Sequence, residues 1–357
     1  MIAKNIRTIM ASVAGVAVAT SAMGEGTAGP SANVYGLFRS EMTYSNGGLA
    51  KIEDGAKASS TTVLGLNVVK FGVKGTLNDK ASFNLRFNFL KPTSADLVDI
   101  ANVSWKASDM FSMTMGKDYV RQGGFSNQDN TFNHIWGDRT QALTFGRNQE
   151  SLSLHYTPGA MHKVTVQLVN DIVDIAETTA KEAQYNTSSK QPAAILEYSG
   201  EFGPIKPLIQ YGQYDLNHSS LWNVGARAKL DATSLTFDYG ANSEFMVVGD
   251  SDKASVSGNM TLRAEHDMGT IVPFFWYNAF NVTDKDVNGG TEKKTNTTGK
   301  WDDNATQISI GSSFKNFGDN WTPYVAYRMT SGKFMNSANK EKTGNTHQLG
   351  LGVTGQF

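Results

Sequence analysis

Apolar and polar residues alternate along this chain in short segments, and the segment 82–89 shows the pattern most clearly. Its apolar positions are Phe83, Leu85, Phe87 and Phe89, and its polar positions are Ser82, Asn84, Arg86 and Asn88. A period of two places successive side chains on opposite faces of a β-strand, so the two faces meet different environments. The segment therefore predicts a strand with one apolar and one polar face.

The same alternation recurs along the whole chain and predicts about sixteen strands. The last segment ends on an aromatic residue, Phe357, and is expected to close a sheet by pairing with the first. The segments lie near 34–39, 69–75, 82–89, 97–106, 110–117, 150–157, 163–169, 192–198, 205–214, 221–230, 235–242, 255–265, 271–280, 305–314, 321–329 and 346–357.

The gaps between these segments alternate between long and short. The gaps 118–149 and 281–304 are long, whereas 78–81, 107–109 and 266–270 are short. Outer-membrane barrels combine long external loops with short periplasmic turns, so every second gap should be long. The pattern predicts an all-β fold, a transmembrane antiparallel β-barrel of about sixteen strands. Pro207, Pro273 and Pro323 strain this prediction, because a closed barrel has no free edge for a residue without an N–H group.

The N-terminus resembles an export signal. Lys4 and Arg7 precede a weakly apolar run rich in alanine and valine, and small residues offer cleavage somewhere in 19–24. An ordinary buried helix is the alternative for this segment. We expect residues 1–22 to be a cleaved signal peptide and residues 23–357 to form a single barrel domain.

Composition is compatible with this view without proving it. The chain has no cysteine and a formal net charge of -1, which gives no sign of disulfides, thiolate metal sites or nucleic-acid binding. Beyond the N-terminus it lacks the run of ~18 apolar residues that a spanning helix needs. A soluble secreted β-protein would share most of these properties.

Several segments, in order, resemble the general bacterial porin family of Gram-negative outer membranes, the sixteen-stranded trimeric type. The similar segments are Val34-Tyr35-Gly36, Phe71 to Leu77, Met113 to Lys117, Arg147 to Pro158, and the terminal Phe357. The resemblance implies a third loop, here 118–148, that folds into the pore. That loop carries Gly123-Gly124-Phe125 and lacks the Pro-Glu-Phe-Gly-Gly signature of the enteric branch, so this chain would belong to a divergent branch.

The resemblance also implies function and partners. It implies an outer-membrane porin, a water-filled channel for passive diffusion of small hydrophilic solutes and ions, without catalysis or a cofactor. The implied partners are two further copies in a homotrimer, lipopolysaccharide and outer-membrane lipid, and no nucleic acid.

The inward face would carry the selectivity of such a pore, which depends on diameter and rings of charge. On the first strands it presents a basic wall, Arg39, Lys70, Lys74 and Arg86. The third loop would present the opposing acids Asp118, Asp129 and Asp138. Later strands add further charges, which are Arg227, Lys229, Arg263, Arg328, Glu41, Asp238 and Glu265. The excess of basic residues suggests a weak preference for anions.

One loop offers a weak metal candidate. Asp284, Asp286 and Asn288 match the start of an EF-hand calcium loop, but Thr295 occupies the place of the final bidentate Glu. We therefore expect a turn-rich external loop and no metal.

Three other functions remain open. A substrate-specific outer-membrane channel is the nearest, although no aromatic slide can be traced on the inward face. An outer-membrane enzyme is less favoured, because the six histidines are dispersed and only His218 lies beside serines. A structural or adhesin barrel is the third.

Overall fold

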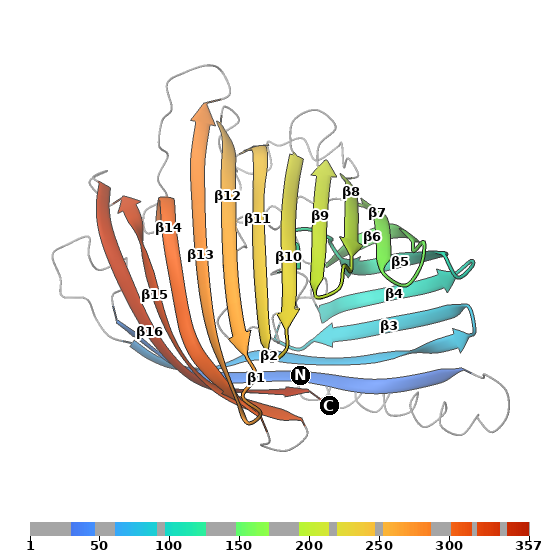
Figure 1. Ribbon diagram of the computed structural model, residues 1–357, viewed down its shortest axis with the longest axis horizontal. Helices are drawn as coiled ribbons and strands as arrows, with labels where there is room; N and C mark the ends of the chain where they lie inside the picture. The colour runs from blue at the N-terminus through green and yellow to red at the C-terminus, as the bar shows by residue number, and fades with distance from the viewer. Residues whose placement is uncertain are drawn as a thin grey trace, which may run out of the picture.

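The computed structural model describes residues 30–46, 61–90, 97–125, 148–170, 193–213, 220–246, 253–286, 301–315, 320–335 and 341–356. These residues form a closed barrel of sixteen strands, each antiparallel to its neighbours (Figure 1). The strands are β1 (Ser31–Asn46), β2 (Thr61–Asn78), β3 (Ala81–Asn88), β4 (Val98–Lys106), β5 (Phe111–Tyr119), β6 (Asn148–Tyr156), β7 (His162–Val169), β8 (Ala193–Gly200), β9 (Ile205–Gln213), β10 (Ser220–Leu230), β11 (Thr233–Met246), β12 (Lys253–His266), β13 (Ile271–Asp286), β14 (Trp301–Phe314), β15 (Trp321–Met335) and β16 (Glu341–Gln356).

The last strand closes the barrel on the first, as the sequence predicted. β1 and β16 pair from Leu37 opposite Gln356 to Asn46 opposite His347. Closure leaves no row of unpaired backbone groups at a sheet edge, which is what a barrel needs in lipid. Phe357 lies outside the described residues.

The alternation along each strand separates a polar interior from an apolar outer surface. On β10, Trp222 is 40% exposed and Val224 38% exposed, whereas Asn223 between them is 3% exposed. The buried amides and hydroxyls on the other strands include Gln167, Gln210, Thr261, Asn278 and Gln307. In a water-soluble protein the apolar residues would be the buried ones, so this inversion identifies a barrel whose outer face meets lipid.

The connections alternate in length, and both described chain ends lie at the end of the barrel with the short turns (Figure 1). The turns there include 79–80, 231–232 and 267–270. This is the periplasmic end, since barrels of this class place their short turns there. Exposed aromatic side chains occur on the outer face, as the interfacial girdles of outer-membrane barrels require; they are Tyr44, Trp105, Trp222, Tyr239, Trp321 and Tyr327.

The three prolines sit where a missing N–H group does least harm. Pro207, Pro273 and Pro323 are each the third residue of an odd-numbered strand, β9, β13 and β15. In each case the ladder with the preceding strand stops at the residue that follows the proline. The proline itself is therefore paired only with the following strand. The strain anticipated from the sequence is therefore relieved at the end of a ladder.

Among the described residues, no helix is both long and apolar enough to cross a membrane. The expected signal peptide, residues 1–22, lies outside the described residues.

Candidate functional site: the lumen and the root of the third loop

The predicted basic wall lies on neighbouring strands. Arg39 is on β1, Lys70 and Lys74 are on β2, and Arg86 is on β3. Register places Lys70 opposite Leu37, and Arg86 opposite Gly72, which lies midway between the two lysines on β2. All four residues therefore lie on the inner face.

Asp99 on β4 links two of these basic residues, and the sequence did not reveal it. Its carboxylate lies 2.7 Å from Arg86 Nε and 2.8 Å from Lys70 Nζ. Strict alternation with Ala101 and Val103 would have placed Asp99 outside. A register shift between Arg86 and Phe87, opposite Ile100 and Val98, turns it inward.

The chain turns into the lumen immediately after β5, so the third loop begins as an inward fold. Residues 120–125, here called the loop root, run along the inner wall past β7, β8, β9 and β11. Side chains of these strands bind its backbone: Gln167 Oε1 accepts from the Arg121 amide at 2.9 Å, and Gln210 Oε1 accepts from the Gly124 amide at 2.9 Å. Arg121 Nη1 also donates to Glu197 at 2.8 Å.

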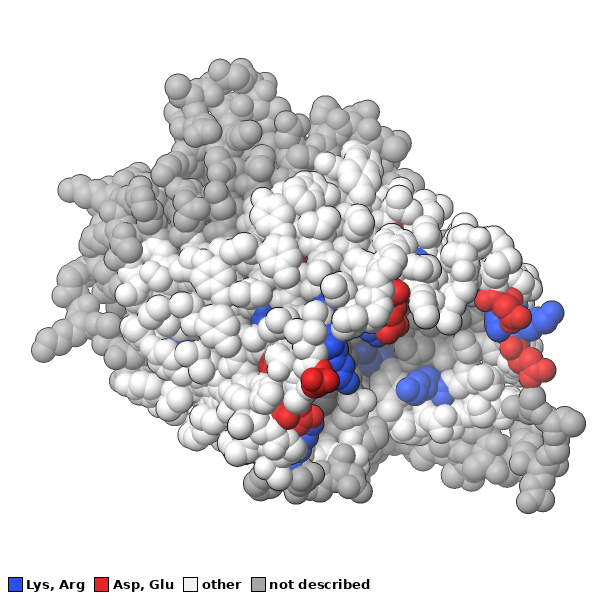
Figure 2. Space-filling view, viewed as in Figure 1, with Lys and Arg blue, Asp and Glu red and all other residues white. Residues whose placement is uncertain are grey.

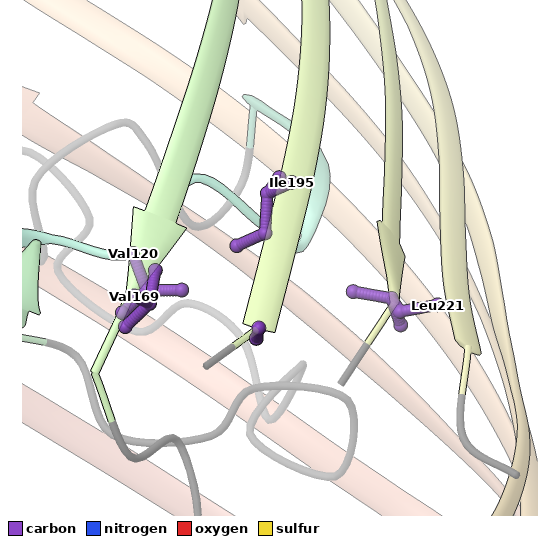
Figure 3. Packing of buried hydrophobic residues seen from close by; sticks show 5 residues of the cluster. Val120, Val169, Ile195 and Leu221 are labelled. Carbon is purple, nitrogen blue, oxygen red and sulfur yellow. The ribbon is translucent and has the colours of Figure 1, made fainter. Parts of the chain in front are cut away.

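An apolar cluster holds the start of the loop root. Val120 packs with Val169, Ile195 and Leu221, and Ala193 completes the cluster (Figure 3). The three strands involved, β7, β8 and β10, contribute these side chains near their external ends. This apolar cluster therefore marks where the root attaches to the inner wall.

A buried carboxylate holds the end of the loop root. Asp238 Oδ1 accepts a hydrogen bond from the Phe125 amide at 2.9 Å, and Asp238 is 1% exposed. The Arg227 guanidinium lies 4.5 Å from the centre of the Phe125 ring, a cation–π contact. A Cβ at Gly124 or Gly225 would lie 2.4 or 2.3 Å from Asp238 Oδ1, so a larger residue at either position would displace this carboxylate.

Of the three acids predicted for the third loop, the described residues include Asp118 alone. Asp118 is half-buried at the end of β5 and pairs with Gln149. Asp129 and Asp138 lie outside the described residues. The sequence also placed Asp238 on the inner wall, but it did not reveal that this carboxylate binds the loop root.

The weak calcium candidate is not a loop where the structure describes it. Asp284 and Asp286 belong to β13 and pair with Ser255 and Lys253 of β12, so their backbone is extended. A calcium loop would require a turn there. Asn288 lies outside the described residues, and the described residues contain no group of three or more potential metal ligands.

Aromatic rings of the inner face lie flat across neighbouring strands. A Cβ at Gly72 would fall 2.4 Å from the Tyr35 ring, and a Cβ at Gly352 would fall 2.4 Å from the Tyr324 ring. Tyr35 donates to Asn84 Oδ1 at 2.8 Å, and Tyr324 donates to a carboxylate oxygen of Glu41. These rings therefore cover glycines of the wall.

A cavity of about 970 Å³ forms the periplasmic mouth of the lumen. It is lined by charged residues of β2, β10 and β12 and by several short turns, namely Lys74, Lys229, Asp231, Arg263, Glu265, Asp267 and Lys315. On the face shown in Figure 2, charged side chains gather around a hollow low in the view and at the right edge, and most of the other described surface is uncharged.

A closed barrel with an apolar exterior, a charged lumen and an inward loop defines a channel-forming outer-membrane protein. A family model described as Gram-negative porin matches residues 8–354. The chain therefore belongs to the Gram-negative porin family and is an outer-membrane porin, a water-filled channel for passive diffusion of small hydrophilic solutes and ions.

Solved structures of other outer-membrane proteins share this fold at low sequence identity. OmpT of Vibrio cholerae is 13% identical with a TM-score of 0.63, covering 94% of this chain and 99% of that one. The anion-selective porin from Comamonas acidovorans is 14% identical with a TM-score of 0.63, covering 92% and 100%. The outer membrane channel DcaP of Acinetobacter baumannii is 12% identical with a TM-score of 0.62, covering 94% and 99%. No curated protein sequence matches the chain significantly.

Proposed function

We propose that this porin is a general diffusion channel with a weak preference for anions. The observation that carries the proposal is the charge balance of the periplasmic mouth. Glu265 is paired with Arg263 at 2.7 Å, and Asp267 with Lys315 at 2.5 Å. Among the described residues, neither Lys74 nor Lys229 lies within ion-pair distance of a carboxylate.

The mouth therefore carries excess positive charge. Asp231 is the one other acid among the described residues that line it, against the two lysines. A net positive charge on the lining of an entrance raises the local concentration of anions, so anions enter more readily than cations. Asp129 and Asp138 of the third loop would face the basic wall across the lumen and create a transverse field, whereas Asp118 lies in the wall itself, on β5. These negative charges would keep the preference for anions weak.

We also propose that the barrel catalyses nothing and has no dedicated solute. The burial of Tyr324, which is 2% exposed, supports a general channel over a substrate-specific one, because a sugar slide needs rings exposed to the solute. A planar lipid bilayer experiment separates these functions. Single-channel steps that scale with salt support the general channel, whereas saturation by one sugar would favour the specific one, and the absence of steps would favour an enzyme or a structural barrel.

Reversal potentials in a salt gradient test the selectivity. We expect anions to be preferred by the natural protein, and the double variant Lys74→Gln, Lys229→Gln to move the reversal potential towards cation selectivity. Lys117→Gln is the control, since Lys117 lines an outer-surface groove with Met115 and Leu168. Clear cation selectivity of the natural protein would refute the proposal.

The strand lengths support the proposed homotrimer. β3 to β9 have 8 or 9 residues each, whereas β11 to β16 have 14 to 16. At a tilt near 45°, nine residues span only about 21 Å, less than the apolar band of about 25 Å. A neighbouring copy would cover this short wall better than lipid, and lipopolysaccharide would meet the long one. The mass of the detergent-solubilised protein tests the assembly, and N-terminal sequencing tests removal of residues 1–22.

A further inference from the structure

We propose that Arg86 is a positioning residue for the loop root and contributes little to ion selectivity. Together with Asp99 it fixes Tyr119, the last residue of β5, and so fixes the point at which the chain enters the lumen. This inference rests on the proposed channel function, because it concerns what sets the width of the pore.

Arg86 forms a buried ion pair within the barrel wall. Arg86 is 4% exposed and Asp99 is 7% exposed, and their ion pair measures 2.7 Å. Lys70 reaches the same carboxylate at 2.8 Å. A guanidinium this deeply covered offers almost no surface to a passing solute, and Asp99 balances one of the two positive charges that meet at its carboxylate, so the more exposed Lys70 is the better placed of the two to act on ions.

Arg86 holds the side chain of Tyr119. Its Nη2 donates to the Tyr119 hydroxyl at 2.5 Å, and the guanidinium lies 5.1 Å from the centre of the same ring. Nε meanwhile donates to Asp99. The planar group therefore donates to Asp99 and to Tyr119 from two different nitrogens at once, a fixed fork geometry that a lysine ammonium lacks.

Gln167 holds the backbone of Tyr119 from the other side. Its Nε2 donates to the Tyr119 carbonyl at 2.8 Å, and its Oε1 accepts from the Arg121 amide at 2.9 Å. Arg86 is on β3 and Gln167 is on β7. In the strand order β3-β4-β5-β6-β7, each therefore lies two strands away from β5, on opposite sides of it. Tyr119 is thus clamped from both directions immediately before the loop root.

Single-channel recording of Tyr119→Phe and Arg86→Lys tests the clamp. Both variants keep the net charge but lose the hydrogen bond between Arg86 and Tyr119. We expect transient excursions to higher conductance to become more frequent, on the order of tenfold, because a charge-assisted bond that holds the root is lost. The reversal potential should stay unchanged, and the double variant should behave like either single one, because both remove the same contact.

Tyr327→Phe is the matched control, since it removes a tyrosine hydroxyl bond to His347 on the outer face. Heat-modifiable migration establishes that each variant forms a barrel. If Arg86→Lys does not fold, Tyr119→Phe still decides, because it leaves the pair of Arg86 and Asp99 in place. A shift in reversal potential with unchanged current fluctuations would overturn the positioning role, and so would unchanged behaviour in both respects. If the natural protein forms no channel, the proposed function fails, and this inference fails with it.

Discussion

Gly225 on β10 lies beneath the end of the loop root, and Gly225→Ala should release that root from the wall. A Cβ at this position would lie 2.3 Å from Asp238 Oδ1 and 3.0 Å from the Phe125 ring. Asp238 Oδ1 is the atom that accepts the Phe125 amide, and Asp238 is 1% exposed, so it has little room to move. The carboxylate can avoid the methyl group only by giving up that bond.

The expected magnitude follows from the contacts that are lost. Forcing a methyl group into a packed site costs about 1–3 kcal/mol, and a hydrogen bond to a charged group contributes about 1.5–3 kcal/mol. Because these two costs overlap, we expect the free energy of docking the root to become less favourable by roughly 2–4 kcal/mol. The equilibrium between the docked and the displaced root would then shift by about 30- to 1000-fold towards the displaced root. The barrel itself should persist, because the ladder of β10 with β9 and β11 is unchanged.

Cysteine labelling measures this equilibrium. The natural chain contains no cysteine, so Gln122→Cys gives one unique thiol at a root position that is 1% exposed. We expect the thiol to react slowly in the parent and much faster when Gly225→Ala is added, with a parallel rise in single-channel conductance. Gly258→Ala is the control, because its Cβ would meet only Gly240 O at 3.9 Å. Equal labelling rates in the Gly225 variant and its parent, or an equal acceleration by Gly258→Ala, would refute the role of Asp238.

Three other changes probe different parts of the barrel. Val120→Ala removes two buried methyl groups from the apolar cluster and should weaken root docking by about 1.5 kcal/mol, detected as faster labelling of the same thiol introduced by Gln122→Cys; unchanged labelling would contradict a packing role. Ile310→Arg should destabilise the barrel by about 2–4 kcal/mol if Ile310 (53% exposed) lies near the centre of the apolar band, whereas Ser313→Arg at the wet mouth should not, as urea unfolding in lipid vesicles would measure. In the periplasmic turns, the hydrogen bond from Lys315 holds the pKa of Asp267 below its ordinary value. The stability that this bond contributes is therefore present at neutral pH and is lost as the pH falls through the lowered pKa. Asp267→Asn should lower the melting temperature at about pH 7 and should match the natural protein in strong acid.

The periodicity of the sequence was enough to predict the barrel. Period-two alternation and long–short gaps depend on neighbours within a strand, and lipid outside and water inside impose them on every strand alike. For this reason segments such as 82–89 and 221–230 were located with nearly correct bounds, and β16 was correctly paired with β1. The inward positions of Arg39, Lys70, Lys74 and Arg86 followed from the same parity.

The alternation of odd and even positions no longer predicts the face of a side chain where a β-bulge intervenes. It also does not predict which side chains meet across the lumen. Asp99 was missed because one irregular residue in β4 reverses its face. The roles of Gln167, Gln210 and Asp238 depend on residues 46 to 113 positions away, brought together only when the barrel closes. The sequence thus determined the wall of the channel, because local alternation encodes which face meets lipid. Only the tertiary structure decided how the third loop is held, because that depends on contacts between strands far apart in the chain.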